Sequence, residues 1–237
     1  MTSLAELCGH TFYLPALGPD SVVLDLGAST AAFSVGVNEL SGCFCYCVEA
    51  APKNFKAIEE TAQIKKFFAA MCGSNKPVYL YIIEDEFHWG SLVAPAGFKV
   101  EERHEVPGKT LECLIHEMKL EKIDLLKVDI EGAEIDMFDA TSDATLRKIY
   151  QITVEFHDFI NPGQREDVRR QIRRFEQLGF DCVVMTHNNH GDVWMVNRQA
   201  MGLNVFKFIF FKSVIKYTRG IRRIFSRYFR QVEGSVA

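Results

Sequence analysis

One segment constrains the fold of this chain more than any other, and it runs from Val22 to Phe33 as VVLDLGASTAAF. Its pattern predicts a buried strand, a tight turn of small residues and the start of a helix. A second apolar segment, Cys43–Val48, then ends in Glu49. An acid about 20 residues after such a turn is placed to bind ribose hydroxyls in a mononucleotide-binding α/β unit. The sequence therefore predicts a site for an adenosine-bearing cofactor.

The glycine pattern of the turn favours S-adenosylmethionine (SAM) over a dinucleotide. A dinucleotide site needs Gly-x-Gly-x-x-Gly, because the pyrophosphate approaches the backbone closely. Here only Gly27 is present, and Ser29 and Ala31 follow it. SAM-dependent methyltransferases carry a looser acid-x-Gly motif, which Asp25 and Gly27 fit. A nicotinamide-dependent oxidoreductase, or a strand-turn-helix without a ligand, remains as the alternative.

Composition indicates one globular domain in a reducing compartment. The 237 residues are 48% hydrophobic and 24% charged, which is ordinary for a globular protein with a substantial core. The N-terminus lacks the pattern of a secretory signal, and no apolar run of about 18 residues predicts a transmembrane helix. Seven cysteines without a repeating framework favour a cytoplasmic protein. Cys43, Cys45 and Cys47 alternate, so we expect small buried thiols on one face of a strand.

The order of elements predicts an α/β fold: a doubly wound, mostly parallel sheet of seven strands. We expect it to end in an antiparallel hairpin, an arrangement typical of SAM-dependent methyltransferases. The predicted domains are an N-terminal segment (1–20), a SAM-binding domain (21–204) and a basic tail (205–237). Strands are expected at Val22–Leu26, Cys43–Val48, Phe67–Met71, Val78–Ile83, Lys99–Val106, Ile123–Val128, Tyr150–Phe156, Phe180–Met185 and Val193–Val196, and helices at Ala31–Leu40, Pro52–Ile64, Leu111–Met118, Glu134–Ala140 and Gln164–Leu178.

A second motif follows the predicted strand Ile123–Val128, which delivers Asp129 and Glu131 to its carboxyl end. The segment KVDIEGAE resembles the Lys-x-Asp-x-Glu-Gly-x-Glu motif of the FkbM family of SAM-dependent methyltransferases. The motif Asp25-Leu26-Gly27-Ala28 and the acid Glu49 also match that family, and the resemblance spans about residues 21–196.

The resemblance implies O-methylation of a hydroxyl on a sugar or natural product, with SAM as the cofactor. The cofactor-binding residues that it implies are Asp25, Gly27, Ala28, Ser29, Glu49, Ser91, Leu92 and Asp129. The chain departs from the family at Ser29 and Ala31, where Asn and Gly are usual, and at Glu112, where Asp is usual. The methyl group of Ala31 is expected to narrow the space for the methionine end of SAM. A SAM-fold protein that has lost catalysis and serves as a membrane adaptor is therefore the non-enzyme alternative.

Four residues at neighbouring strand ends are the predicted catalytic group: His157, Asp129, Glu131 and Glu155. A base that accepts the hydroxyl proton adds roughly 10²–10⁴-fold to the rate. His157 is the best candidate, because the ordinary pKa of histidine lies near neutrality. Asp129 is expected to face the SAM methionine or the acceptor hydroxyl, and the two glutamates to bind acceptor hydroxyls or orient His157.

Asp129, Glu155 and His157 are adequate metal ligands, but the spacing requires no metal and we predict none. Acids in the first turn of the helix that follows, such as Glu134, complement its dipole without a catalytic role.

The C-terminal tail is basic, whereas acidic side chains predominate in the rest of the chain. From Val205 onward eight basic residues stand against Glu233 alone. On a helix, residues 210–230 would present an aromatic-rich face and an opposite cationic face. Such a helix is typical of an anionic membrane interface, so we expect peripheral attachment to the inner face of a membrane and a lipid-linked glycan or other small-molecule acceptor. Docking on the domain or a twin subunit is the alternative, and nucleic acid is disfavoured by the acidic body.

Overall fold

The computed structural model describes residues 4–83, 90–92 and 99–203. The chain divides into two compact units, Met1–Asn197 and Arg198–Ala237, and only residues 198–203 of the second unit are described. The predicted basic tail lies outside the described residues. Within them, no helix combines the length and apolar character needed to cross a membrane.

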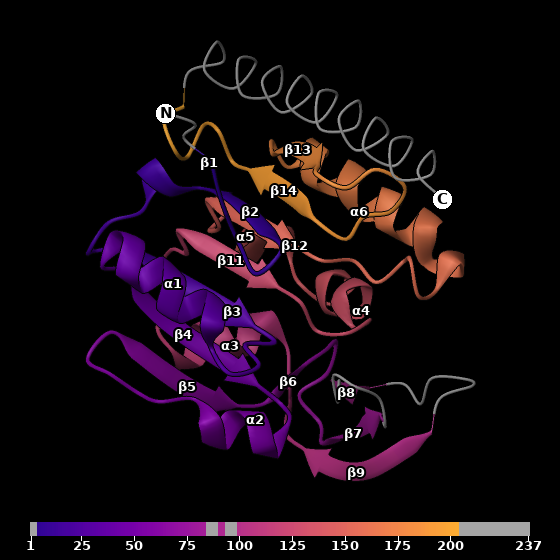
Figure 1. The fold of residues 1–237 in the computed structure, drawn as a ribbon. Helices are drawn as coiled ribbons and strands as arrows, with labels where there is room; N and C mark the ends of the chain where they lie inside the picture. Colours follow the sequence, from indigo (N-terminus) through magenta and orange to yellow (C-terminus); the bar gives the residue numbers. More distant parts are fainter. Residues whose placement is uncertain (1–3, 84–89, 93–98, 204–237) are drawn as a thin grey trace, which may run out of the picture. The chain divides into compact units, whose positions relative to one another are not determined.

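A mainly parallel sheet forms the centre of the first unit, as expected (Figure 1). Its order is β13-β14-β12-β11-β3-β4-β5. β14 runs antiparallel to both of its neighbours, and the other adjacent pairs are parallel. The strands are β3 (Val22–Leu26), β4 (Phe44–Glu49), β5 (Ile64–Phe68), β11 (Leu125–Val128), β12 (Gln151–Val154), β13 (Asp181–Val184) and β14 (Val193–Val196). The carboxyl ends of β3, β4, β11 and β12 therefore meet at one edge, where ligands of such sheets bind.

Helices cover both faces of the sheet, because neighbouring residues of each strand point to opposite faces. Val23 packs with Phe33 of α1, whereas Leu24 packs in the cluster that contains Phe138 of α4 and Phe175 of α6. The helices are α1 (Ala32–Ser41), α2 (Pro52–Ala57), α3 (Leu111–Glu117), α4 (Glu134–Asp139), α5 (Asp143–Leu146) and α6 (Arg165–Gln177), with 3₁₀ turns η1 (Leu14–Ala16) and η2 (Pro162–Gln164). The three alternating cysteines Cys43, Cys45 and Cys47 are buried thiols on the α1 face.

The predicted helix Pro52–Ile64 is wrong beyond Ala57, where α2 ends. Thr61 accepts hydrogen bonds from the amides of Gln63 and Ile64 through its hydroxyl, which forms a turn in place of a further helical turn. Ile64 then begins β5, which pairs with β4. The predicted strand Phe67–Met71 is likewise divided, because Ala70–Met71 leaves β5 and pairs as β6 with β10 (Gly108–Lys109).

Two predicted strands lie outside the central sheet. β7 (Val78–Ile83) and β9 (Val100–Val106) pair antiparallel, and β8 (Gly90–Ser91) completes a small sheet in the order β8-β7-β9. Most side chains of β9 are exposed, as expected for an antiparallel strand with one face in solvent.

The N-terminal residues form a hairpin that belongs to the first unit. β1 (Leu4–Leu7) and β2 (His10–Tyr13) pair antiparallel, and β2 is hydrogen-bonded to residues of the central sheet. The Tyr13 amide donates to the Gln151 side chain at 2.9 Å, and the Thr11 hydroxyl donates to Asp192 at 2.6 Å. This packing brings His10 to the functional edge of the sheet, although the sequence sets residues 1–20 apart as a separate segment.

Candidate active site

A cavity of about 340 Å³ lies at the carboxyl ends of β3, β4 and β11. Six of the predicted site residues line it: Gly27, Ser29, Glu49, Leu92, Asp129 and Glu131. The predicted cofactor residues Asp25, Ala28 and Ser91 are not among those that line it, and neither are Glu155 and His157. Residues not singled out as site residues complete the lining: Val48, Ala50, Ala51, Asn54, Ala69, Ala70, Met71, Leu80, Gly90 and Ile130.

The loop after β3 can accept only glycine at position 27. Gly27 has a φ of +74°, and a Cβ atom there would lie 1.7 Å from the backbone oxygen of Asp129. The amides of Gly27 and Ala28 both donate to the backbone oxygen of Val48, at 2.9 and 3.0 Å. The loop is thus held between β4 and β11, with its backbone against the cavity.

Ser29 and Ala31 also take left-handed backbone conformations, with φ of +50° and +65°. Non-glycine residues rarely do so, and each such residue carries strain. The Ala31 methyl group is buried in the cluster with Phe33 and Val37 and does not line the cavity. This placement does not support the expectation that the methyl group narrows the space for SAM.

Glu49 connects the end of β4 to this loop. One carboxylate oxygen accepts from the Ser29 amide and the other from the Ala51 amide, both at 2.7 Å. Burial raises the pKa of Glu49 above its ordinary value. Each carboxylate oxygen still has a lone pair for a ligand hydroxyl.

Lys127 is a buried cation beneath the same loop. Its ammonium group donates to the backbone oxygen of Gly27 at 2.6 Å and lies 3.3 Å from Asp25 and 3.5 Å from Asp129. Burial lowers the pKa of Lys127, but the two carboxylates outweigh it and hold that pKa above its ordinary value. Asp25 also accepts from the Ser34 hydroxyl at 2.8 Å and is fully buried, so it supports the loop from below and does not face the cavity.

The structure brings the predicted catalytic residues together around His157. Its Nε2 lies 3.1 Å from Glu131 and 3.7 Å from Asp129, and its Nδ1 lies 2.9 Å from Glu134. Burial alone would lower the pKa of His157, but Glu131 and Glu134 outweigh it and raise the pKa to about 11. His157 is therefore an imidazolium at neutral pH, and the expectation of a near-neutral base does not fit its surroundings.

Glu134 has a larger role than the helix-dipole interpretation gives it. Its side chain is buried, and Oε1 accepts from the amides of Ile130 (3.2 Å) and Gly132 (3.0 Å) besides facing His157. Glu131 between them has a φ of +55°, a strained conformation of the kind that collects at functional sites. Glu134 thus fixes the loop that presents Glu131 to the cavity.

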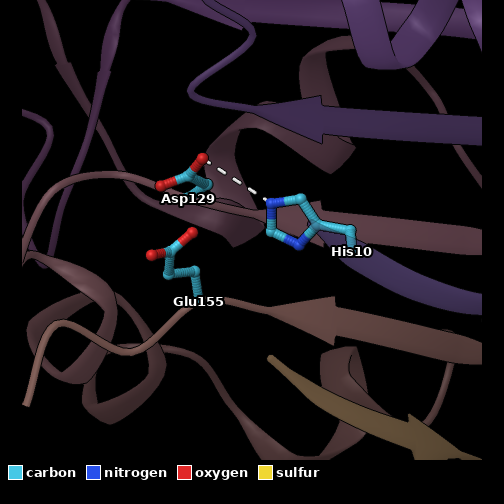
Figure 2. A group of neighbouring side chains, drawn as sticks. All are labelled: His10, Asp129 and Glu155. Atoms are coloured by element: carbon cyan, nitrogen blue, oxygen red, sulfur yellow. Dashed lines mark ion pairs between the residues drawn. The ribbon is translucent and has the colours of Figure 1, made fainter. Parts of the chain in front are cut away.

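Asp129 and Glu155 form the other part of this acid cluster. Burial would raise the pKa of Asp129, but His10, Lys127 and His157 hold it below its ordinary value. Burial and the nearby Asp129 raise the pKa of Glu155. His10 is the residue that the sequence analysis missed: its Nε2 lies 3.6 Å from Asp129 (Figure 2). No signal in the sequence marks it, because it stands outside both motifs and arrives through the packing of β2.

Comparisons with known proteins point to methyltransferases. The family model of the methyltransferase FkbM domain matches residues 30–182. The AMB antimetabolite synthetase AmbE of Pseudomonas aeruginosa is 44% identical over 57 residues, which are 24% of this chain and 3% of the synthetase.

Two solved structures are among those that this chain matches. The FkbM methyltransferase of Methylobacillus flagellatus KT is 10% identical, with a TM-score of 0.49 over 76% of this chain and 44% of that one. TrmK of M. capricolum, in complex with S-adenosyl-homocysteine, is 7% identical, with a TM-score of 0.39 over 77% of this chain and 63% of that one. This chain therefore spans less than half the length of the first of these structures and a small part of the synthetase.

Proposed function

Because this chain belongs to the FkbM family of methyltransferases, we propose that it transfers the methyl group of SAM to a hydroxyl of a sugar or small natural product. The observation that carries the proposal is the cavity at the sheet edge, where the Gly27 loop and Glu49 stand opposite Asp129 and Glu131. SAM bound there would supply a methyl group made electrophilic by its sulfonium.

The residues of the cavity fit this cofactor. Gly27 leaves backbone free of side chain at the point of closest approach, and Glu49 is held by two backbone amides with lone pairs remaining for ribose hydroxyls. Met71, Leu80 and Leu92 supply an apolar wall that suits an adenine ring.

Glu131 is the group that we assign to accept the hydroxyl proton of the acceptor. It lines the cavity, and its Oε2 is paired with His157, which leaves Oε1 without a partner among the described residues. His157, protonated on both nitrogens, orients Glu131 and cannot itself take a proton. The carboxylates of Asp129 and Glu155 are the remaining hydrogen-bond acceptors that can orient the substrate hydroxyl next to Glu131.

Calorimetric titration tests the cofactor assignment. We expect SAM and S-adenosylhomocysteine to bind to the full-length protein, and Glu49→Ala to weaken both at least tenfold, or about 1.4 kcal/mol. NAD is the control ligand. Binding of NAD without SAM would favour the oxidoreductase alternative and overturn the proposal.

Transfer of labelled methyl from SAM to a panel of hydroxylated acceptors tests the reaction. Glu131→Gln should keep SAM affinity and lower the transfer rate by roughly 10²–10⁴-fold. An equal rate in this variant would remove Glu131 as the base, and SAM binding without transfer to any acceptor would favour the adaptor alternative. The similarity to a segment of an antimetabolite synthetase supports including small natural products in the panel.

The sequence of the tail supports a lipid-linked acceptor as the more specific proposal. Its eight basic residues and aromatic spacing favour attachment to the cytoplasmic face of an anionic membrane. Flotation with anionic vesicles would recover the full chain but not a chain that ends at Gly202. Equal recovery of the two proteins would contradict membrane attachment and leave the methyltransferase proposal intact.

A further inference from the structure

We propose that His10, Asp129 and Glu155 hold one divalent cation, of the Mn²⁺ or Zn²⁺ type, beside the cavity (Figure 2). The three side chains come from β2 and from the ends of β11 and β12. The spacing along the sequence predicts no metal site, because the imidazole is contributed by a residue more than a hundred positions away. Its role in catalysis rests on the proposed function, but cation binding itself does not.

The distances suit a shared ion. One ligand atom from each of the three side chains lies within 4.8 Å of the others, and His10 Nε2 is 3.6 Å from Asp129 Oδ2. Ligand atoms that are each about 2.1 Å from one ion are about 3 to 4.2 Å apart. Small side-chain rotations therefore suffice to close the site.

The buried His10 distinguishes this cluster from a simple pair of carboxylates. Its ring is fully buried, and its Nε2 has no hydrogen-bond partner among the described residues. Leaving a buried polar nitrogen unpaired costs about 1–3 kcal/mol, so such an atom calls for a ligand. In Figure 2 the ring presents a nitrogen to the two carboxylates.

The second nitrogen of His10 is held in the manner of a metal ligand. Nδ1 lies 3.3 Å from the Thr153 hydroxyl, and that hydroxyl donates to Asp192 at 3.5 Å. Where that hydroxyl gives its proton to Asp192, it accepts one from His10 Nδ1; this tautomer leaves the lone pair on Nε2, and it is the one that a cation at Nε2 requires. Hydrogen bonds of this kind fix the tautomer and ring orientation of metal-binding histidines.

The neighbouring cluster of Asp129, Glu131 and His157 is the weaker candidate. Both nitrogens of His157 already face carboxylates, Nδ1 at 2.9 Å from Glu134 and Nε2 at 3.1 Å from Glu131. Neither nitrogen is free to bind a cation. His10 differs in that its Nε2 lies 3.6 Å from Asp129 Oδ2, beyond hydrogen-bond distance, and has no hydrogen-bond partner among the described residues.

Charge also favours a cation at the His10 site. Asp129 has Lys127 at 3.5 Å, and Glu131 has His157 at 3.1 Å. The half-buried Glu155 donates its backbone amide to Val128, but its carboxylate forms no hydrogen bond or ion pair within the described part of the chain. One imidazole and two carboxylates are a ligand set for borderline-to-hard divalent cations.

A cation held by three protein ligands keeps open positions, and Asp129 borders the cavity. An acceptor hydroxyl bound at an open position would have a lowered pKa. Its proton would then pass to the carboxylate of Glu131, which is not one of the three ligands. The site therefore assigns Asp129 and Glu155 to the cation and leaves Glu131 as the base.

Mn²⁺ binding to the full-length protein tests the site. After treatment with a chelator, the protein is titrated with Mn²⁺, and free Mn²⁺ is measured by electron paramagnetic resonance. We expect one Mn²⁺ per chain and a nitrogen modulation from one imidazole in the spin-echo spectrum. Glu155→Gln should weaken binding at least tenfold, by analogy with the loss caused even by outer partners of a metal site. Glu131→Gln, which removes the same charge from the neighbouring cluster, should change binding far less.

His10→Gln should abolish the nitrogen modulation. If that variant does not fold, the presence or absence of the modulation in the unmutated protein still tests whether an imidazole binds the Mn²⁺. Absence of stoichiometric Mn²⁺ binding, absence of the nitrogen signal, or an equal loss in the two glutamate variants would overturn the site. SAM titration of the metal-free protein separates the two proposals. SAM binding without Mn²⁺ binding overturns the cation site alone, and Mn²⁺ binding without SAM binding overturns the proposed function alone.

Discussion

The two sides of the cavity are held by different forces. The side that we propose to bind SAM, called the cofactor side below, consists of the Gly27 loop and Glu49, which are fixed by backbone geometry and by amide hydrogen bonds. On the acid side, Asp129 and Glu131 are fixed by buried charges, with Lys127 on one flank and His157 on the other. The cofactor side should therefore respond to changes in side-chain size, and the acid side to changes in charge at constant size.

Removal of the buried cation should give the largest effect. Lys127→Met keeps most of the volume but leaves Asp25 and Asp129 buried without their counter-charge. Breaking a buried pair in this way costs about 3–5 kcal/mol, which urea unfolding would measure. Adding Asp25→Asn should recover part of the loss. A loss below about 1 kcal/mol, the range of exposed ion pairs, would show that charge does not hold the acid side.

On the cofactor side, a single methyl group added at Gly27 should also have a large effect, in this case on SAM affinity. Gly27→Ala adds a Cβ 1.7 Å from the Asp129 oxygen at a φ of +74°, so the loop must move away from β11. We expect SAM affinity to fall at least tenfold by calorimetry, or about 1.4 kcal/mol. Gly179→Ala is the matched control, because its φ of +95° carries the same kind of strain with no atom within 4 Å of the new Cβ. Equal losses of stability in the two variants would mean that strain, and not crowding, explains the need for glycine.

Removal of the Glu134 charge should have a smaller effect on the stability of the acid side. Glu134→Gln weakens hydrogen bonds from Ile130, Gly132 and His157 to a buried carboxylate. Hydrogen bonds to charged groups contribute about 1.5–3 kcal/mol, so we expect a loss in this range by urea unfolding. Asp136→Asn removes the same charge from the same helical turn, where the carboxylate is bonded to Gly73. Similar small losses in both variants would support the helix-dipole interpretation of Glu134.

The loop after β3 and the ends of the central strands could be predicted from the sequence, because both depend on local patterns. Apolar strands followed by acids place Asp129, Glu131, Glu155 and His157 at one edge, and the structure brings them together. The motif around Gly27 likewise forms the loop that lines the cavity.

Partners far apart in the sequence could not be predicted in this way. His10 reaches the site because β2 packs on the sheet, and its partner Thr153 is 143 residues away. The raised pKa of His157 depends on two carboxylates that converge on one ring, which no spacing rule reveals. The small sheet of β7, β8 and β9 was missed for the same reason, because a strand pattern does not say with which strand it pairs.

The smallest expected effect is a gain in stability on the cofactor side. Ala31, the N-cap residue that precedes α1, has a φ of +65°, where an L-residue is strained by about 1–2 kcal/mol. Glycine removes that strain but adds about 0.5–1 kcal/mol of unfolded-state entropy, so Ala31→Gly should stabilise the protein by roughly 0.5–1 kcal/mol in urea unfolding.

SAM affinity should stay the same in Ala31→Gly, because the methyl group lies in the hydrophobic cluster and outside the cavity. Tighter SAM binding without a gain in stability would contradict this placement and restore the expectation that Ala31 narrows the site. A gain in stability with unchanged SAM affinity would mean that alanine in place of glycine at this position lowers the free energy of unfolding and does not affect cofactor binding. The cofactor side would then be held by backbone conformation even where its sequence departs from the family motif.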